Sequence, residues 1–126
     1  MVLVSAGGEV SLEDAPGMVF HLLEELGVVA PEYEKLRAGY YGTLTMSTAQ
    51  VAQLRRETLE ARARHEARRR REVMRARKIH SSDPKVVDRV VDQLLAGDPW
   101  LVKLDEIVGL CEATIARGDT ITCVGD

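Results

Sequence analysis

One long helical run constrains the fold of this chain more than any other feature. Ser47, with Gln50 three residues later, forms the capping box that starts an α-helix, and the helical pattern continues to about His80. At 1.5 Å per residue, a helix of this length is a rod of about 50 Å, which is longer than a small domain is wide. Either one end of the helix projects from the domain or the helix breaks.

Four shorter helices are expected beside the long one, each from an apolar stripe at helical spacing together with a capping or turn residue. The first begins at Asp14 and ends before Gly27, the second begins at Pro31, the third begins at Ser82 or Asp83 and ends before Gly97, and the fourth begins at Asp98 and ends before Gly118. Aspartate is a common helix cap, proline fits the first turn, and glycine ends a helix in the left-handed conformation.

Two short β segments are predicted near the ends of the chain. VLVSA and EVSL, on either side of Gly7 and Gly8, are typical of a hairpin with these glycines as its two-residue turn. TITCV, close to the carboxyl end, favours a strand that can pair with the hairpin. The two ends of the chain are therefore expected to meet in one small β element.

The expected fold class is mainly α. Aromatic residues make up only 4% of the chain, so the core is predicted to consist of Leu, Val, Ile and Ala, a composition that suits helix packing. A turn through Thr43 and Leu44 should lead into the long helix. We expect a single α-rich domain over residues 1–126, a bundle of about five helices including one long Arg-rich helix, with a small β element formed by the N-terminal hairpin and the C-terminal strand.

The charge is divided unevenly along the chain. The formal net charge is −3, yet residues 51–80 hold eleven basic and four acidic side chains, whereas the remainder holds six basic and sixteen acidic ones. The stretch ARARHEARRRREVMRARK, residues 61–78, contains eight of the arginines. A basic rod in an acidic body indicates an interaction surface, unless the two parts neutralise each other within the fold.

The cellular compartment is inferred from signals that the sequence lacks: a membrane span, a signal peptide and a disulfide framework. No apolar run approaches the length of a membrane span, and MVLVSAGGEVSLED turns polar too early for a secretory signal peptide. Cys111 and Cys123 are too few for a disulfide framework. We therefore expect a cytoplasmic protein that does not associate with a membrane.

Catalysis by a nucleophile is not predicted. The chain lacks a nucleophile-elbow motif, and its three histidines, His21, His65 and His80, have no obvious partners. Cys111 falls on the apolar face of the last helix, where a thiol is usually an inert core residue. We expect that the protein is not an enzyme.

Metal and cofactor sites are not predicted either. Neither a Cys-x-x-Cys pair nor a His-x-x-x-His pair occurs, and the chain has no glycine-rich phosphate loop. Asp14, Asp83 and Asp98 stand at helix starts, where capping is the simpler role.

Helical spacing pairs many arginines of the long helix with glutamates of the same helix. The pairs four residues apart are Glu60 with Arg64, Arg62 with Glu66, Glu66 with Arg70, and Arg68 with Glu72. Each such pair stabilises a helix by about 0.2–0.5 kcal/mol. The basic residues without a close acid on the helix are Arg69, Arg71, Arg75, Arg77 and Lys78. These residues are predicted to attract phosphates or the carboxylates of another protein.

The predicted partner-binding surface contains charges of both signs. Its members are Arg64, Arg68, Arg69, Arg71 and Arg75 of the long helix and Glu24 and Glu25 of the first helix. The two glutamates point away from the apolar stripe of their own helix, so they should face water or a partner.

Three segments carry a resemblance to a known family. They are YEKLRAGYYGTL, the start of the long helix at VAQLRRE, and VGLCEATIARGDTI near the end. The arrangement resembles the helical immunity proteins of bacterial polymorphic toxin systems, although the Arg-rich middle of the long helix departs from their pattern. The resemblance implies a small cytosolic protein without catalytic residues that binds a cognate toxin and covers its active or substrate-binding surface.

Three functions follow from these observations. The first is protein binding, with a toxin as the partner that the resemblance implies. The second is nucleic-acid binding through Arg68 to Arg71 and Arg75. Three features argue against it: the interspersed glutamates, the acidic remainder of the chain and the lack of aromatic residues among the arginines. The third is a structural or assembly protein of a phage or multi-subunit complex, in which the long helix bridges copies.

Overall fold

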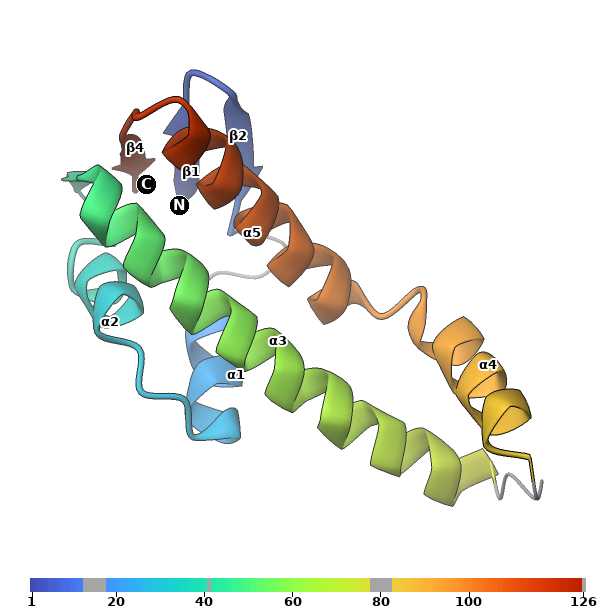
Figure 1. The fold of residues 1–126 in the computed structure, drawn as a ribbon. Coiled ribbons are helices and arrows are strands. Elements are labelled where there is room, and N and C mark those ends of the chain that lie inside the picture. Colours follow the sequence, from blue (N-terminus) through green and yellow to red (C-terminus); the bar gives the residue numbers. More distant parts are fainter. Residues whose placement is uncertain (13–17, 41, 78–82, 126) are drawn as a thin grey trace.

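Helices make up most of the protein, and the sheet lies at one end (Figure 1). The computed structural model describes residues 1–12, 18–40, 42–77 and 83–125. In chain order the elements are β1 (Val2–Ser5), β2 (Gly8–Ser11), α1 (Met18–Leu26), α2 (Pro31–Ala38), β3 (Thr43–Met46), α3 (Thr48–Arg77), α4 (Pro84–Leu95), α5 (Pro99–Ala116) and β4 (Ile121–Val124). The prediction of a mainly α fold with a small β element is confirmed.

Both ends of the chain enter one antiparallel sheet. Its strand order is β2-β1-β4-β3, so the C-terminal strand pairs with the N-terminal hairpin as predicted. Val10, Leu3, Cys123 and Leu44 are direct neighbours on successive strands and form one apolar row. This row packs into the same core as the helices, which places the sheet against them.

The prediction of a turn at Thr43 and Leu44 is wrong, because these residues belong to β3. Thr43 and Thr45 are exposed, whereas Leu44 is half-buried and Met46 is buried. This alternation matches a strand with one covered face. The signal is only four residues long, and pairing with β4 is what makes the segment a strand.

The hairpin turn lies one position earlier than predicted. Ser5 pairs with Gly8, so the two turn residues are Ala6 and Gly7 rather than Gly7 and Gly8. Gly8 is the first residue of β2 and has φ +149°, a conformation that residues with a side chain rarely adopt.

Helix α3 is continuous over thirty residues. The predicted capping box is present at its start, where the Gln50 N–H donates to Ser47 Oγ (3.3 Å) and the Ser47 N–H donates to Gln50 Oε1 (2.9 Å). Helices α1 and α2 lie on one side of its first half, and α5 runs along another side (Figure 1). The long helix is therefore the element on which the other helices pack.

The larger core forms where the sheet, α1, α2, α5 and the first half of α3 meet. Leu3, Leu36, Leu54, Ile107 and Ile121, from five different elements, are completely buried there. The predicted apolar face of the last helix is confirmed, because its central residues belong to this core.

The distal end of α3 projects beyond this core and packs mainly on α4. From that end, α4 and then α5 return along α3 (Figure 1). Val73 of α3, Val91 and Leu95 of α4, and Leu101 at the start of α5 form a second, smaller cluster. Of the two possibilities raised by the length of the helix, the projecting end is the correct one.

The caps of α4 and α5 agree with the predictions. Asp83 accepts a hydrogen bond from the Lys85 N–H (3.0 Å), and Asp98 accepts from the N–H groups of Trp100 (2.9 Å) and Leu101 (3.1 Å). A proline follows each aspartate in the first helical turn. The predictions made at Asp14, Pro16, Lys78, His80 and Ser82 lie outside the described residues.

Helix α2 receives its cap from another helix. Its N-cap residue, Ala30, has no side chain that can accept a hydrogen bond. Glu57 of α3 is buried and accepts from the backbone N–H groups of Glu32 (3.0 Å) and Tyr33 (3.3 Å) instead. Burial raises the pKa of Glu57, although these hydrogen bonds partly oppose the shift. The carboxylate joins α2 to α3 inside the core.

Candidate functional site

Many arginines of α3 are bonded to acids of the same helix. All four predicted pairs are present, with distances of 2.8 Å for Arg64–Glu60, 2.7 Å for Arg62–Glu66, 3.2 Å for Arg70–Glu66 and 3.9 Å for Arg68–Glu72. The side chains of these pairs are about a third to a half exposed to solvent, so each pair adds little to stability. Their main effect is to reduce the charge that α3 presents to a partner.

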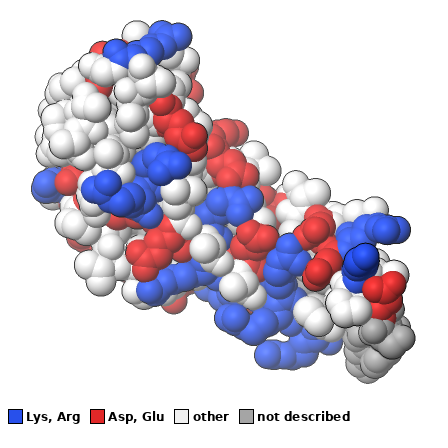
Figure 2. Space-filling model, in the orientation of Figure 1, with Lys and Arg blue, Asp and Glu red and all other residues white. Residues whose placement is uncertain are grey.

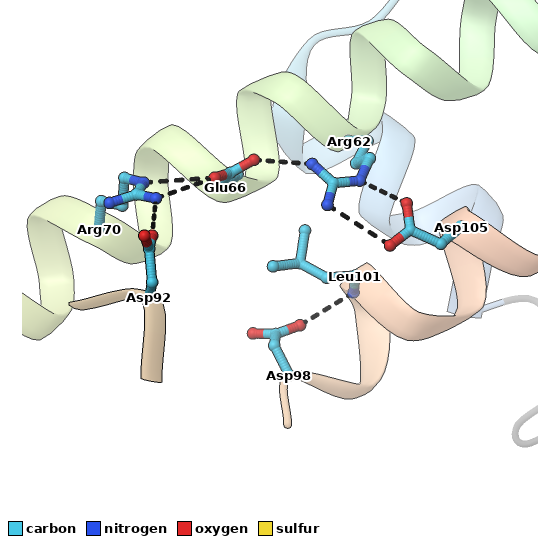
Figure 3. Close-up of polar contacts among 7 residues, drawn as sticks. All are labelled: Arg62, Glu66, Arg70, Asp92, Asp98, Leu101 and Asp105. Carbon is cyan, nitrogen blue, oxygen red and sulfur yellow. Dashed lines mark hydrogen bonds and ion pairs between the residues drawn. The ribbon is translucent and has the colours of Figure 1, made fainter. Parts of the chain in front are cut away.

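A ladder of ion pairs joins α3 to α4 and α5 on one side (Figure 3). Glu66 lies between Arg62 and Arg70 and bonds both. Arg62 contacts both carboxylate oxygens of Asp105 in α5, and Arg70 bonds Asp92 in α4. On this side, the acidic part of the protein neutralises the basic helix.

A buried polar cluster forms around Asp98, at the start of α5. Besides capping the helix, its carboxylate contacts His65 Nε2 (3.0 Å) and accepts from Arg69 Nε (3.2 Å). Arg69 also bonds Glu72 of its own helix (2.6 Å). The predictions that His65 has no partner and that Arg69 has no close acid are therefore wrong. Asp98 lies 33 residues from His65, which a rule based on helical spacing cannot detect.

His65 has a polar contact at each ring nitrogen. Nε2 lies 3.0 Å from the Asp98 carboxylate, which can only accept, and Nδ1 lies 3.3 Å from Arg68 Nη2. Burial alone would raise the pKa of Asp98, but the hydrogen bonds from the Leu101 N–H and from His65 lower it below its usual value. Nε2 of His65 thus joins α3 to the start of α5, whereas Nδ1 contacts Arg68 of the same helix.

Four arginines form what we call the basic strip along one face of α3. They are Arg64, Arg68, Arg71 and Arg75, at the helical spacing i, i+4, i+7 and i+11. The first two are engaged with α1, because Arg64 Nη1 donates to the carbonyls of Leu26 and Gly27 (3.0 Å each) and Arg68 lies 3.6 Å from Glu25. The end of α1 therefore covers the proximal part of the strip.

The predicted acidic residues of the surface are divided between two contacts. Glu25 meets the basic strip at Arg68, whereas Glu24 bonds Arg37 of α2. The hydrogen bond from Arg37 lowers the pKa of Glu24. The structure therefore brings Glu25, but not Glu24, to the predicted arginines.

The distal part of the basic strip, Arg71 and Arg75, is exposed. Neither side chain has an acidic partner among the described residues, while the other three arginines of the predicted surface each have one. Figure 2 shows basic side chains gathered along the edge of the molecule where the distal end of α3 lies. These two arginines remain as candidates for binding a partner.

The thiols offer no comparable site. Cys111 and Cys123 are fully buried, and burial raises the pKa of Cys111 to about 12 and that of Cys123 to about 11. Over the described ranges, no group of three or more His, Cys, Asp or Glu side chains is arranged to hold a metal ion. The helices of these ranges are also too short or too polar to cross a membrane.

Comparisons with family models, with curated proteins and with solved structures give no match for this chain. The resemblance to immunity proteins therefore stays a prediction. Any function must be inferred from the surface itself, above all from the distal part of the basic strip.

Proposed function

We propose that this protein is a non-enzymatic binding protein that docks an acidic protein surface on Arg71 and Arg75. One observation carries the proposal. Within the described part of the chain, each arginine of residues 61–70 is paired with an acid of the protein itself, whereas Arg71 and Arg75 have no such partner. The intramolecular pairing stops where α1 ends and the face of α3 becomes open.

The spacing of the two arginines favours carboxylate partners. Arg71 and Arg75 are one helical turn apart, so their like charges repel each other by a few tenths of a kcal/mol, roughly 0.2–0.5. A guanidinium group binds a carboxylate through two parallel hydrogen bonds, and such contacts both remove the repulsion and fix the orientation of the partner. Complementary charge also speeds the encounter.

A protein partner fits the surroundings better than a nucleic acid does. Double-stranded DNA carries one negative charge per roughly 1.7 Å of its axis, so binding requires a basic surface of some extent. Here the free part of the basic strip consists of two arginines only, because Arg64 and Arg68 are paired with acids of the protein itself. A protein needs to offer acidic side chains only opposite Arg71 and Arg75.

The resemblance to immunity proteins supports a more specific form of the proposal. In that form the partner is a cognate toxin, and the chain blocks the toxin by covering its active or substrate-binding surface. Because Arg71 and Arg75 are basic, the toxin would present acidic side chains beside the surface that is covered.

The test is co-purification with the product of the neighbouring gene, using a charge-reversal variant. Arg71→Glu/Arg75→Glu should weaken the complex at least about tenfold, because both carboxylate contacts become repulsive. Arg56→Glu/Arg117→Glu makes the same change in net charge at two exposed arginines outside the basic strip, so this control should bind as the wild type does. Circular dichroism would verify that both variants are folded.

Three results would contradict the proposal. The first is the absence of any complex at micromolar concentration, and the second is equal binding by the two double variants. The third is retention of duplex DNA or RNA that falls steeply with salt and disappears in Arg71→Glu/Arg75→Glu, which would identify a nucleic-acid-binding surface instead.

A further inference from the structure

Helix α4 buries only half of its apolar stripe. The stripe consists of Val86, Val87, Val90, Val91, Leu94 and Leu95, all expected in the core from their spacing. Val91 and Leu95 are 1% and 5% exposed, but Val86 and Leu94 are 41% and 40% exposed. Val86, Val90 and Leu94 are four residues apart, so they form a continuous apolar line along one side of α4.

Leu94, at the end of this line, borders a hollow between α3 and α4, which we call the open groove. Its walls are Arg69, Glu72, Val73 and Ala76 of α3 and Leu94 of α4, and its volume is about 380 Å³. The opposite side of the same helix pair carries the ladder between α3 and α4 (Figure 3). One side of the pair is thus closed by ion pairs, whereas the other has an uncovered apolar surface.

The open groove lies next to the free arginines. Glu72 and Ala76 in its wall directly follow Arg71 and Arg75 in the sequence, and consecutive residues of an α-helix are about 100° apart around the axis. The distal part of the basic strip therefore lies outside the groove, next to the wall that Glu72 forms on the α3 side. Val73, Ala76 and Leu94 give the groove apolar contacts between its polar walls, and with the free arginines beside it this surface is complementary to a helix that has one apolar face and acidic residues beside it.

We infer that the open groove receives an amphipathic, acidic helix of the partner protein. The apolar face of that helix packs on Val86, Val90 and Leu94, and its carboxylates bind Arg71 and Arg75. A third helix laid into the groove between two others completes a small bundle, and α4, with twelve residues, supports a partner segment of about three turns. This inference rests on the proposed function, to which it adds the type of element that binds.

A second copy of the chain is a poorer occupant of the groove. In a two-fold dimer the same surface is used by both subunits, so the arginines of both copies would enter one interface. The positive charges of both copies would then add up in one interface, which opposes association. The free arginines therefore favour a different, acidic protein.

The test uses a synthetic helical peptide of about sixteen residues, with Leu at positions i, i+4 and i+8 and Glu on the flanking positions. The control peptide has the same composition in a scrambled order. We expect the amphipathic peptide alone to bind, with changes in the NMR signals of the Val86, Val90 and Leu94 methyl groups. Leu94→Ser should weaken binding about tenfold, as expected for the loss of an apolar anchor.

Val102→Ser is the matched control, because Val102 is 47% exposed and lies on the side of the ladder. It should bind the peptide as the wild type does, and thermal unfolding would show that both serine variants fold. Val86→Ser, on the same line of α4 as Leu94, provides a second variant of the groove.

Four results would overturn the inference. They are equal binding of the scrambled peptide, no binding of the amphipathic peptide, equal effects of Leu94→Ser and Val102→Ser, and self-association that Leu94→Ser abolishes. If the variants Leu94→Ser and Val86→Ser still bind the natural partner and the variant Arg71→Glu/Arg75→Glu does not, the groove is excluded as the binding site and the proposed function stands. If the charge reversal leaves the natural partner bound, the proposed function fails as well.

Discussion

Asp98 is a single residue with two structural roles. It caps α5 and also holds His65 and Arg69 of α3, whereas Asp83 caps α4 and is exposed. Asp98→Ala should therefore cost about 2–4 kcal/mol of unfolding free energy, and Asp83→Ala about 1 kcal/mol. Urea unfolding of both variants measures the difference, and equal costs would show that the bonds to α3 contribute nothing.

The pH dependence of the Asp98 contribution has a definite sign. Hydrogen bonds lower the pKa of Asp98 in the folded protein, so its contribution is complete above the unfolded-state pKa of about 3.9. It is lost as the pH falls through the lower folded-state value. The stability difference between the wild type and Asp98→Asn should therefore shrink as the pH falls below about 4.

Glu57 should show the opposite pH dependence. Burial raises the pKa of Glu57, so its contribution to stability is complete below the unfolded-state value of about 4.3 and is lost as the pH rises through the folded-state value. Glu57→Gln keeps an oxygen that can accept from the Glu32 N–H but cannot ionise. Unfolding measurements should show the variant gaining stability relative to the wild type between about pH 4 and 7. A difference independent of pH would contradict this prediction.

The elements that could be predicted are those with local signals. The capping box at Ser47 and the caps Asp83 and Asp98 start their helices without help from the rest of the chain. Strand β3 has no such signal, since its four residues become a strand by pairing with β4. The hairpin was placed correctly but its turn was shifted by one residue, because two adjacent glycines allow either position.

Contacts between elements could be predicted only in part. Helical spacing correctly identified the pairs four residues apart within α3 and left Arg71 and Arg75 without a partner, but it missed the pair Arg69–Glu72, three residues apart. The spacing could not reveal Asp92, Asp98 and Asp105, which reach α3 from other helices. It also could not show that α3 covers only one side of the apolar stripe of α4, because the width of a buried face depends on the neighbour that packs on it.

At the scale of the whole molecule, the described residues form two apolar cores of unequal size. The larger core joins the sheet to α1, α2, α5 and the first half of α3, whereas the smaller one contains Val73, Val91, Leu95 and Leu101. Since α3 passes through both, its two halves are held by very different amounts of buried apolar surface. The end that carries the distal part of the basic strip and the open groove is therefore the less stable end, which suits a surface that adjusts to a partner.

Hydrogen exchange should reveal this inequality within the single helix α3. Amides of residues 68–77 and of α4 should exchange at least about tenfold faster than amides of residues 51–61, because the smaller core can open while the larger one stays folded. Val91→Ala removes a fully buried side chain from the smaller core and should accelerate exchange only in the distal group. Val90→Ala makes the same change at a half-buried position and should have little effect. Uniform protection along α3, or acceleration of both groups by Val91→Ala, would mean that the two cores open as one unit.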